Sequence, residues 1–275
     1  MKKAKFLIPQ LKARPQLLVL FLCLLLVVLA FTSQFTSQKS SNSDFFSEYP
    51  VITPKPFKSA LPLQTSGVPQ LMPWRGIIQP VISAGTAQVF LKVPTDQPVI
   101  FVGIDDGITK DPATKHWLVK SRLPFTMFLD NDAVKNNYAY FQELQAAGLG
   151  IENHTMTHPK LTRLNFNQQA NEICAAADTY EKIFGRRPTL FRPPYGSWDE
   201  NTRRAAWDCG MKAIIMWHAV VGNGAIQYQD TNNHFEPGDI VLMHFHPDLL
   251  EDMKAFAAQA EKDHLQVARL EDWIR

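Results

Sequence analysis

The sequence predicts an α/β domain built on a parallel sheet, either an open sheet or a barrel. From Ala87 onward, short apolar runs alternate with longer amphipathic stretches, as repeated strand and helix units require. Gly148, Gly185 and Gly210 stand where the predicted helices end. Acidic, basic and imidazole side chains recur directly after the apolar runs. In a parallel barrel these positions meet on the face that carries the active site.

The composition is that of a globular protein with a sizeable core, since 45% of the 275 residues are hydrophobic. The 28 basic and 26 acidic residues give a formal net charge of +2. This balance lacks the basic field that nucleic-acid binding needs, so we expect no nucleic-acid partner.

Residues 1–35 are expected to form a membrane anchor or a signal peptide. Five lysines and arginines precede an uncharged, largely apolar run from Leu17 to Phe31. A signal-peptide core needs about 7 to 15 apolar residues and a spanning helix about 20, and this run lies between the two. We favour the anchor over cleavage after Val28-Leu29-Ala30. Either alternative exports the rest of the chain, to an extracellular domain at the cell membrane or to a secreted protein.

Residues 36–86 are rich in Ser, Thr, Gln and Pro and predict a disordered linker, which leaves residues 87–275 as the folded domain. Within that domain the expected strands are the runs VIFVGI, FTMFL, LGI, TLF, AIIMW, DIVLMHF and LQVARL. The expected helices lie at 112–122, 134–148, 166–184, 198–209 and 248–263. Ser197 and Glu200 predict a capping box at the start of the fourth helix.

Cysteine usage leaves one pairing open. Cys23 lies in the N-terminal apolar run, so Cys174 and Cys209 are the only cysteines of the domain that is expected to be exported. The compartment permits a disulfide between them, and two buried free thiols are the alternative.

The stretch GIDDG ends the first strand on two adjacent carboxylates, Asp105 and Asp106. Neighbouring side chains on a strand point to opposite faces, so both acids can serve one site only where the strand breaks. Gly107 favours such a break.

His154 and His158, in NHTMTH, are spaced so that one helical turn or a compact loop can direct both imidazoles at one metal ion. A carboxylate from Asp105 or Asp106 would complete a site with open positions for water and substrate. The second carboxylate is then available as the base that takes a proton from the attacking water. Such a ligand set accepts zinc, cobalt, nickel or manganese, and zinc is our expectation.

Two further motifs follow predicted strands. His244, in IVLMHFHP, is placed to return a proton to the leaving group. Arg192 opens RPPYG, where its guanidinium can hold a carboxylate ionised while a backbone amide of the turn faces an oxyanion.

Taken in order, IDDG, HTMTH, RPPYG and LMH resemble the motifs of the polysaccharide deacetylases of carbohydrate esterase family 4, the NodB-homology domain. The resemblance covers residues 97–275. It implies a distorted (β/α) barrel and a metal-dependent hydrolase that removes acetyl groups from a polysaccharide. The implied roles are a base (Asp105), metal ligands (Asp106, His154, His158), a holder of the base (Arg192), an oxyanion amide (Tyr195), an acetyl pocket (Leu242) and an acid (His244).

Two departures from the family pattern stand out. The first motif usually reads Thr or Ser, then Phe, before the two aspartates, whereas Gly103 and Ile104 stand here. An Asp-Trp motif that walls the pocket has no clear match. Trp217, His218 and Asp230 are candidates to replace it, and we expect Trp217 to contact the substrate.

The leading interpretation is an exported deacetylase of a cell-wall or extracellular glycan, with N-acetyl groups favoured over O-acetyl groups. A non-catalytic glycan-binding module that retains the metal site is one alternative, because the Asp-Trp motif is missing. A hydrolase of another amide, including cyclic amides, is the other.

Overall fold

The computed structural model describes residues 85–274. The predicted anchor or signal segment and nearly all of the predicted linker lie outside the described residues. Within residues 85–274, no helix combines the length and the apolar character needed to cross a membrane.

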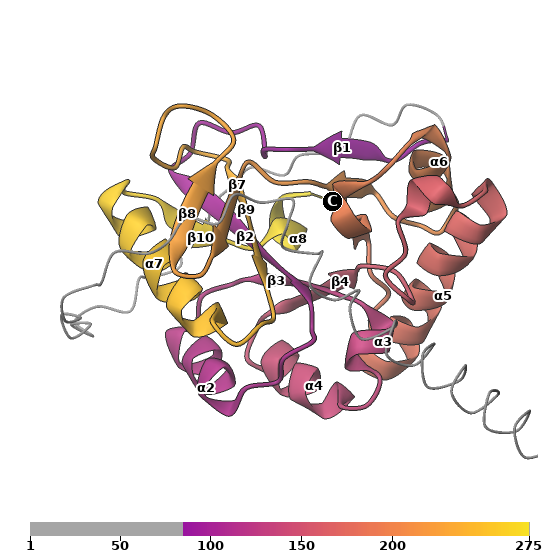
Figure 1. Cartoon of the computed structure of the whole chain (residues 1–275), viewed down its shortest axis with the longest axis horizontal. Coiled ribbons are helices and arrows are strands. Elements are labelled where there is room, and N and C mark those ends of the chain that lie inside the picture. Colours follow the sequence, from indigo (N-terminus) through magenta and orange to yellow (C-terminus); the bar gives the residue numbers. More distant parts are fainter. Residues whose placement is uncertain (1–84, 275) are drawn as a thin grey trace, which may run out of the picture. The chain divides into compact units, whose positions relative to one another are not determined.

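The described residues form an α/β half-barrel around one sheet, with strands in the order β1-β6-β5-β4-β3-β2-β9-β7-β8 and β10 paired with the start of β2 (Figure 1). All pairings between these strands are parallel except the hairpin of β7 and β8. This confirms the predicted parallel α/β class and its barrel form. The strands are β1 (Gln88–Phe90), β2 (Val99–Asp106), β3 (Thr126–Leu129), β4 (Gly150–Asn153), β5 (Leu190–Phe191), β6 (Ala213–Ile215), β7 (Ala219–Gly222), β8 (Ala225–Tyr228), β9 (Ile240–His244) and β10 (Gln266–Ala268).

Helices form at every predicted position, and most of them cover the outside of the sheet. They are α2 (Pro112–Ser121), α3 (Asn131–Val134), α4 (Tyr138–Ala146), α5 (Phe166–Phe184), α6 (Glu200–Asp208), α7 (Leu249–Lys262) and α8 (Leu270–Trp273), with short 3-10 turns at Leu161–Arg163 and Pro194–Gly196.

Two helix predictions differ in detail from the structure. The stretch 134–148 is divided between α3 and α4, because the side chain of Asn137 caps a new helix start by accepting from the amide of Tyr140. The capping box of α6 is made by Asp199 and Thr202, not by Ser197 and Glu200. Asp199 is the extended residue directly before the first helical turn, so its carboxylate reaches the free amides there.

The hairpin of β7 and β8 was not predicted. Its turn is Asn223-Gly224, and both residues have positive φ, 53° and 70°. This is the backbone that two-residue hairpins require and that Asn-Gly favours. The predicted run AIIMW ends as a strand at Ile215, so the hairpin occupies the sequence directly after Trp217 and His218.

The two faces of β2 meet different cores. Ile100, Val102 and Ile104 pack into a large cluster with residues of α2, α4 and α7, whereas Val99 and Phe101 pack inside the half-barrel. By strand alternation Asp105 belongs to the inner face. The end of β2 therefore brings a carboxylate into the interior of the half-barrel.

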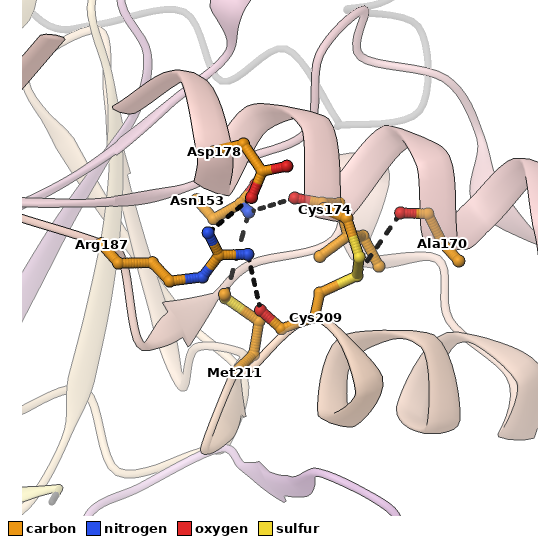
Figure 2. The surroundings of a disulfide bond; sticks show 8 residues. Asn153, Ala170, Cys174, Asp178, Arg187, Cys209 and Met211 are labelled. Atoms are coloured by element: carbon orange, nitrogen blue, oxygen red, sulfur yellow. Dashed lines mark hydrogen bonds and ion pairs between the residues drawn. A yellow bond between two sulfur atoms is a disulfide. The ribbon is translucent and has the colours of Figure 1, made fainter. Parts of the chain in front are cut away.

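A disulfide joins Cys174 of α5 to Cys209 at the end of α6, which settles the open cysteine pairing (Figure 2). Arg187 donates to the carbonyl of Cys209, and Asn153 of β4 donates to the carbonyl of Ile173, the neighbour of Cys174. The disulfide thus joins the two helices, and the hydrogen bond from Asn153 holds α5 to the end of the strand that precedes the histidine motif.

Replacing both cysteines, in Cys174→Ser/Cys209→Ser, is expected to lower the free energy of unfolding by about 3–4 kcal/mol, because the 35-residue separation sets the lost loop-closure entropy. Urea denaturation with and without reductant measures it. The wild type should shift on reduction and the variant should not. Equal midpoints for wild type and variant under oxidising conditions would contradict a stabilising disulfide.

Candidate active site

Asp105 and Asp106 reach the same site because the chain turns at Asp106 itself. Asp106 has a φ of 71° and Gly107 a φ of 95°, so the extended strand geometry ends between the two acids. A side chain at position 107 would collide with Val134 and Phe141, which makes glycine necessary there. The sequence correctly indicated a break in this segment. That break is the left-handed backbone conformation of Asp106.

Asp106, His154 and His158 come together in one cluster. Asp106 Oδ1 lies 3.4 Å from His154 Nε2 and 3.2 Å from His158 Nε2. One ligand atom from each of the three residues lies within 4.8 Å of the others. Atoms bound to one ion at about 2.1 Å lie roughly 3.0–3.5 Å apart, and both distances from Asp106 to the imidazoles fall in this range.

The donor chemistry of the cluster also fits a cation. His154 Nδ1 lies 2.6 Å from the carbonyl of Arg192 and donates to it, so the Nε2 lone pair is directed at Asp106. Asp106 Oδ1 is buried and has no hydrogen-bond partner. Two imidazole nitrogens and a carboxylate oxygen that converge in this way are typical of metal ligands.

The loop between the two histidines is compact and not helical. Thr155 and His158 both have positive φ. Asn153 accepts from the amide of Thr155, and Glu172 of α5 accepts from the amides of Met156 and Thr157. These two side chains fix the loop that carries the candidate ligands.

Arg192 and Asp105 form an ion pair inside the half-barrel. Arg192 Nη1 donates to Asp105 Oδ1 at 2.7 Å, and both residues are buried. Its Nε and Nη2 donate to the carbonyls of Ile215 and Met216, and the guanidinium stacks 4.3 Å from the ring centre of Phe128. Asp105 is therefore held through one oxygen, while Oδ2 lies 3.8 Å from His154 Nε2, toward the ligand cluster.

Gly103 makes room for this ion pair. A Cβ at position 103 would lie 2.7 Å from Cζ of Arg192, closer than real side chains approach. The glycine at this position of the first motif is thus explained by the guanidinium that packs against it.

Charged neighbours shift the pKa values of Asp106 and His154. Burial raises the pKa of Asp106, but the imidazoles of His154 and His158 outweigh it and hold the pKa well below its usual range. Burial lowers the pKa of His154, and the carboxylates of Asp105 and Asp106 more than restore it. Asp106 is therefore an ionised carboxylate at neutral pH.

His244 and Leu242 approach the site from β9. The register pairs Leu242 with Gly103 and His244 with Asp105. Burial lowers the pKa of His244, an effect that Asp106 and Asp105 only partly offset. β9 thus places an imidazole beside the carboxylate pair and an apolar side chain beside Gly103.

Tyr195 and Trp217 border the same site. The ring of Tyr195 meets that of His158 at a centre distance of 4.8 Å, and its backbone has a φ of 60°. Trp217 packs against Gly196 and lies 5.9 Å from the Arg192 guanidinium. Strained backbone at an aromatic residue is common where a site needs a fixed geometry.

Of the three candidates for the missing Asp-Trp motif, only Trp217 lies beside the site. His218 Nδ1 lies 3.1 Å from Asp239, and Asp230 lies 3.5 Å from the other ring nitrogen. Asp239 directly precedes β9, whereas His244 ends it, about 16 Å further along the strand. His218 and Asp230 therefore form a separate ionic cluster at the opposite end of β9.

Comparison with known proteins identifies the family. The sequence profile described as polysaccharide deacetylase matches residues 92–214. An uncharacterized protein of Streptomyces coelicolor is 36% identical over 187 residues, which cover 66% of this chain and 75% of that protein. The chain belongs to the polysaccharide deacetylase family.

Other relatives place this deacetylase domain among proteins of different lengths. A peptidoglycan-N-acetylglucosamine deacetylase of Bacillus cereus is 28% identical over 58% of this chain and 78% of its own length. A bifunctional xylanase/xylan deacetylase of Cellvibrio japonicus is 29% identical over 52% of this chain, but this segment spans only 23% of that longer protein.

A solved structure shares the deacetylase fold. A family 4 carbohydrate esterase pseudoenzyme from Bacillus anthracis superposes with a TM-score of 0.60 over 69% of this chain and 71% of its own, at 19% identity. At this identity the likeness shows the fold alone.

The sequence did not reveal two residues that shape the deacetylase site. Asn153 directly precedes His154, and its ability to cap the next turn was a usable signal. Glu172 lies fourteen residues after His158 on the surface of α5, and only the folded chain brings it to the histidine loop.

In the polysaccharide deacetylase, Gly103→Ala is expected to displace the Arg192 guanidinium from Asp105 and to lower the free energy of unfolding by about 1–3 kcal/mol through overpacking. Urea denaturation measures the change, and a crystal structure locates Arg192. The matched control is Gly222→Ala, because nothing lies within 4 Å of a Cβ there. Equal stability of both variants, with Arg192 unmoved, would contradict the close packing.

Proposed function

We propose that this domain is a metal-dependent hydrolase that removes N-acetyl groups from a cell-wall or extracellular polysaccharide. The observation that carries the proposal is the division of the two adjacent acids. Asp105 is held by Arg192, and Asp106 faces His154 and His158. Family membership supports the deacetylase chemistry.

In this proposal Asp106, His154 and His158 hold a divalent cation, with zinc expected and cobalt, nickel or manganese as alternatives. When bound, the cation supplies Lewis acidity toward the acetyl group and the attacking water. The remaining steps belong to side chains and backbone of this chain.

Asp105 acts as the base. Its Oδ1 is occupied by Arg192, so Oδ2 is the oxygen that takes the proton of the attacking water. The hydrogen bond from the guanidinium fixes the direction of this carboxylate. Leu242 packs against the acetyl methyl group, and the backbone amide of Tyr195 donates to the developing oxyanion.

His244 returns a proton to the leaving nitrogen. Burial lowers the pKa of His244, so the imidazole releases readily any proton that it has taken up. Trp217 forms one wall of the substrate pocket beside Gly196. Its indole ring takes the place of the missing Asp-Trp motif in that wall.

The N-terminal sequence supports a location for the enzyme outside the cell membrane. The basic flank and the apolar run from Leu17 to Phe31 support an anchor in the cell membrane, with cleavage and secretion as the alternative. A domain tethered outside the membrane would meet a cell-wall glycan directly.

Acetate release from a panel of substrates tests the function. The purified protein is chelated, supplied with one divalent metal at a time, and incubated with peptidoglycan, chitohexaose, acetylated xylan and small cyclic amides. We expect acetate from the N-acetylated glycans and none after chelation. Preferential release from xylan would indicate O-deacetylation, ring opening would indicate an amidase of another class, and metal binding without turnover would indicate a glycan-binding module.

Separate substitutions of Asp105 and His154 test the two roles in this mechanism, that of the base and that of a metal ligand. Asp105→Asn should retain the metal but lose about 10²–10⁴-fold in kcat, because the base is removed. His154→Ala should lose both metal and activity. Elemental analysis and acetate assays report the two properties, and His116→Ala on the exposed side of α2 is the control. Unchanged metal content in His154→Ala would refute the ligand assignment.

A further inference from the structure

Two exposed aromatic rings follow β5 in the loop that begins at Arg192. Tyr195 is 51% exposed and Trp198 is 38% exposed. Among the described residues, the other strongly exposed large apolar side chains are aliphatic: Leu91, Ile108 and Val119. Tyr195 contacts His158 of the candidate site, but Trp198 has no part in the mechanism proposed above.

The backbone on both sides of Trp198 is fixed. Ser197 bonds through its hydroxyl to that of Thr162 at 2.8 Å, and its amide donates to the carbonyl of Pro194. Asp199 accepts from the amide of Thr202 and from the side chain of Gln169. An exposed indole on a backbone held at both neighbours is preorganised to receive a ligand.

A polar groove lies along the start of α5 on the same side of the site. It has a volume of about 430 Å³ and is lined by Leu164, Asn165, Asn167, Gln168, Asn171 and Glu172. Glu172 also accepts from the histidine loop. Gln169, one residue beyond Gln168, contacts Asp199, the neighbour of Trp198. The groove is thus connected to the histidine loop and to the Trp198 loop.

The lining of the groove suits an uncharged, hydroxyl-rich ligand. Four of its six residues carry side-chain amides, which can hydrogen-bond to sugar hydroxyls. The amide oxygens of Asn165 and Gln168 already accept from the backbone in the capping box of α5, so Asn167 and Asn171 are the residues that offer both a donor and an acceptor. Its one charged group, Glu172, is engaged with the histidine loop. The flat apolar face of an indole complements the C–H face of a pyranose ring. Amides and an exposed indole together match a neutral glycan.

We propose that Trp198 and the amide-lined groove on α5 bind sugar units of the polysaccharide chain beyond the unit that loses its acetyl group. The inference rests on the proposed function for the position of the scissile unit. It adds a binding subsite on α5 and on the loop before α6. The neighbouring sugars stack on Trp198 and donate to Asn167 and Asn171.

Kinetics on long and short substrates test the subsite. Trp198→Ala should raise the KM for chitohexaose about 5- to 10-fold and leave kcat unchanged. Hydrolysis of 4-nitrophenyl acetate, which has no sugar rings, should be unaffected. Trp198→Phe should recover part of the loss, and Asn167→Ala/Asn171→Ala should raise the KM in the same direction. Val119→Ala on α2 is the control for removing an exposed apolar side chain.

Equilibrium binding separates failure of the subsite from failure of the proposed function. Calorimetric titration of the full chain with chitohexaose should give a Kd that increases 5- to 10-fold in Trp198→Ala. If the wild type binds chitohexaose but releases no acetate, the proposed reaction is wrong and the subsite stands on the Kd shift. If wild type and Trp198→Ala have equal Kd and KM values, or if the wild type does not bind chitohexaose, the subsite is refuted.

Discussion

The ion pair of Arg192 and Asp105 organises the interior of the half-barrel. Arg192 is 0% exposed, and its side chain reaches Asp105 at the end of β2 and two carbonyls at the end of β6, while its own carbonyl holds His154. A buried charge of this kind needs an opposite charge and hydrogen bonds to offset its desolvation. Each of the three guanidinium nitrogens donates to one acceptor, and the residue thereby joins four segments of the chain at one point.

This arrangement gives two chemically identical side chains different surroundings. Asp105 shares its charge with a guanidinium that never deprotonates, while Asp106 is surrounded by imidazoles. The turn in the backbone between them makes the difference possible, since an unbroken strand would send one acid into the apolar cluster under α2 and α4. The different charged neighbours of the two acids therefore depend on the left-handed backbone of Asp106.

The sequence predicted the parts of the fold that follow from local pattern. Alternating apolar and amphipathic segments located the central strands and the main helices, and the position of polar residues after strands correctly grouped Asp106, His154 and His158. The capping box of α6 was misplaced by two residues, because Ser197 and Asp199 both have side chains that suit a cap. Which of these two residues caps the helix depends on the backbone conformation of the residues directly before its first turn.

What the sequence could not predict depends on contacts between distant segments. Glu172 orders the histidine loop from a helix surface, where nothing distinguishes it from a solvated glutamate. The Cys174–Cys209 bond required knowledge that α5 and α6 pack side by side, as Figure 2 shows. His218 was a reasonable substitute for the missing Asp-Trp motif by its position in the sequence, yet the chain directs it to Asp239.

The close packing of Arg192 on Gly103 also constrains how this chain can evolve. A larger residue at position 103 is accepted only after the guanidinium has moved, and the guanidinium cannot leave while Asp105 depends on it. Neither position can change alone without passing through a damaged intermediate. Among descendants of this chain, positions 103 and 192 should therefore be exchanged together or remain as they are.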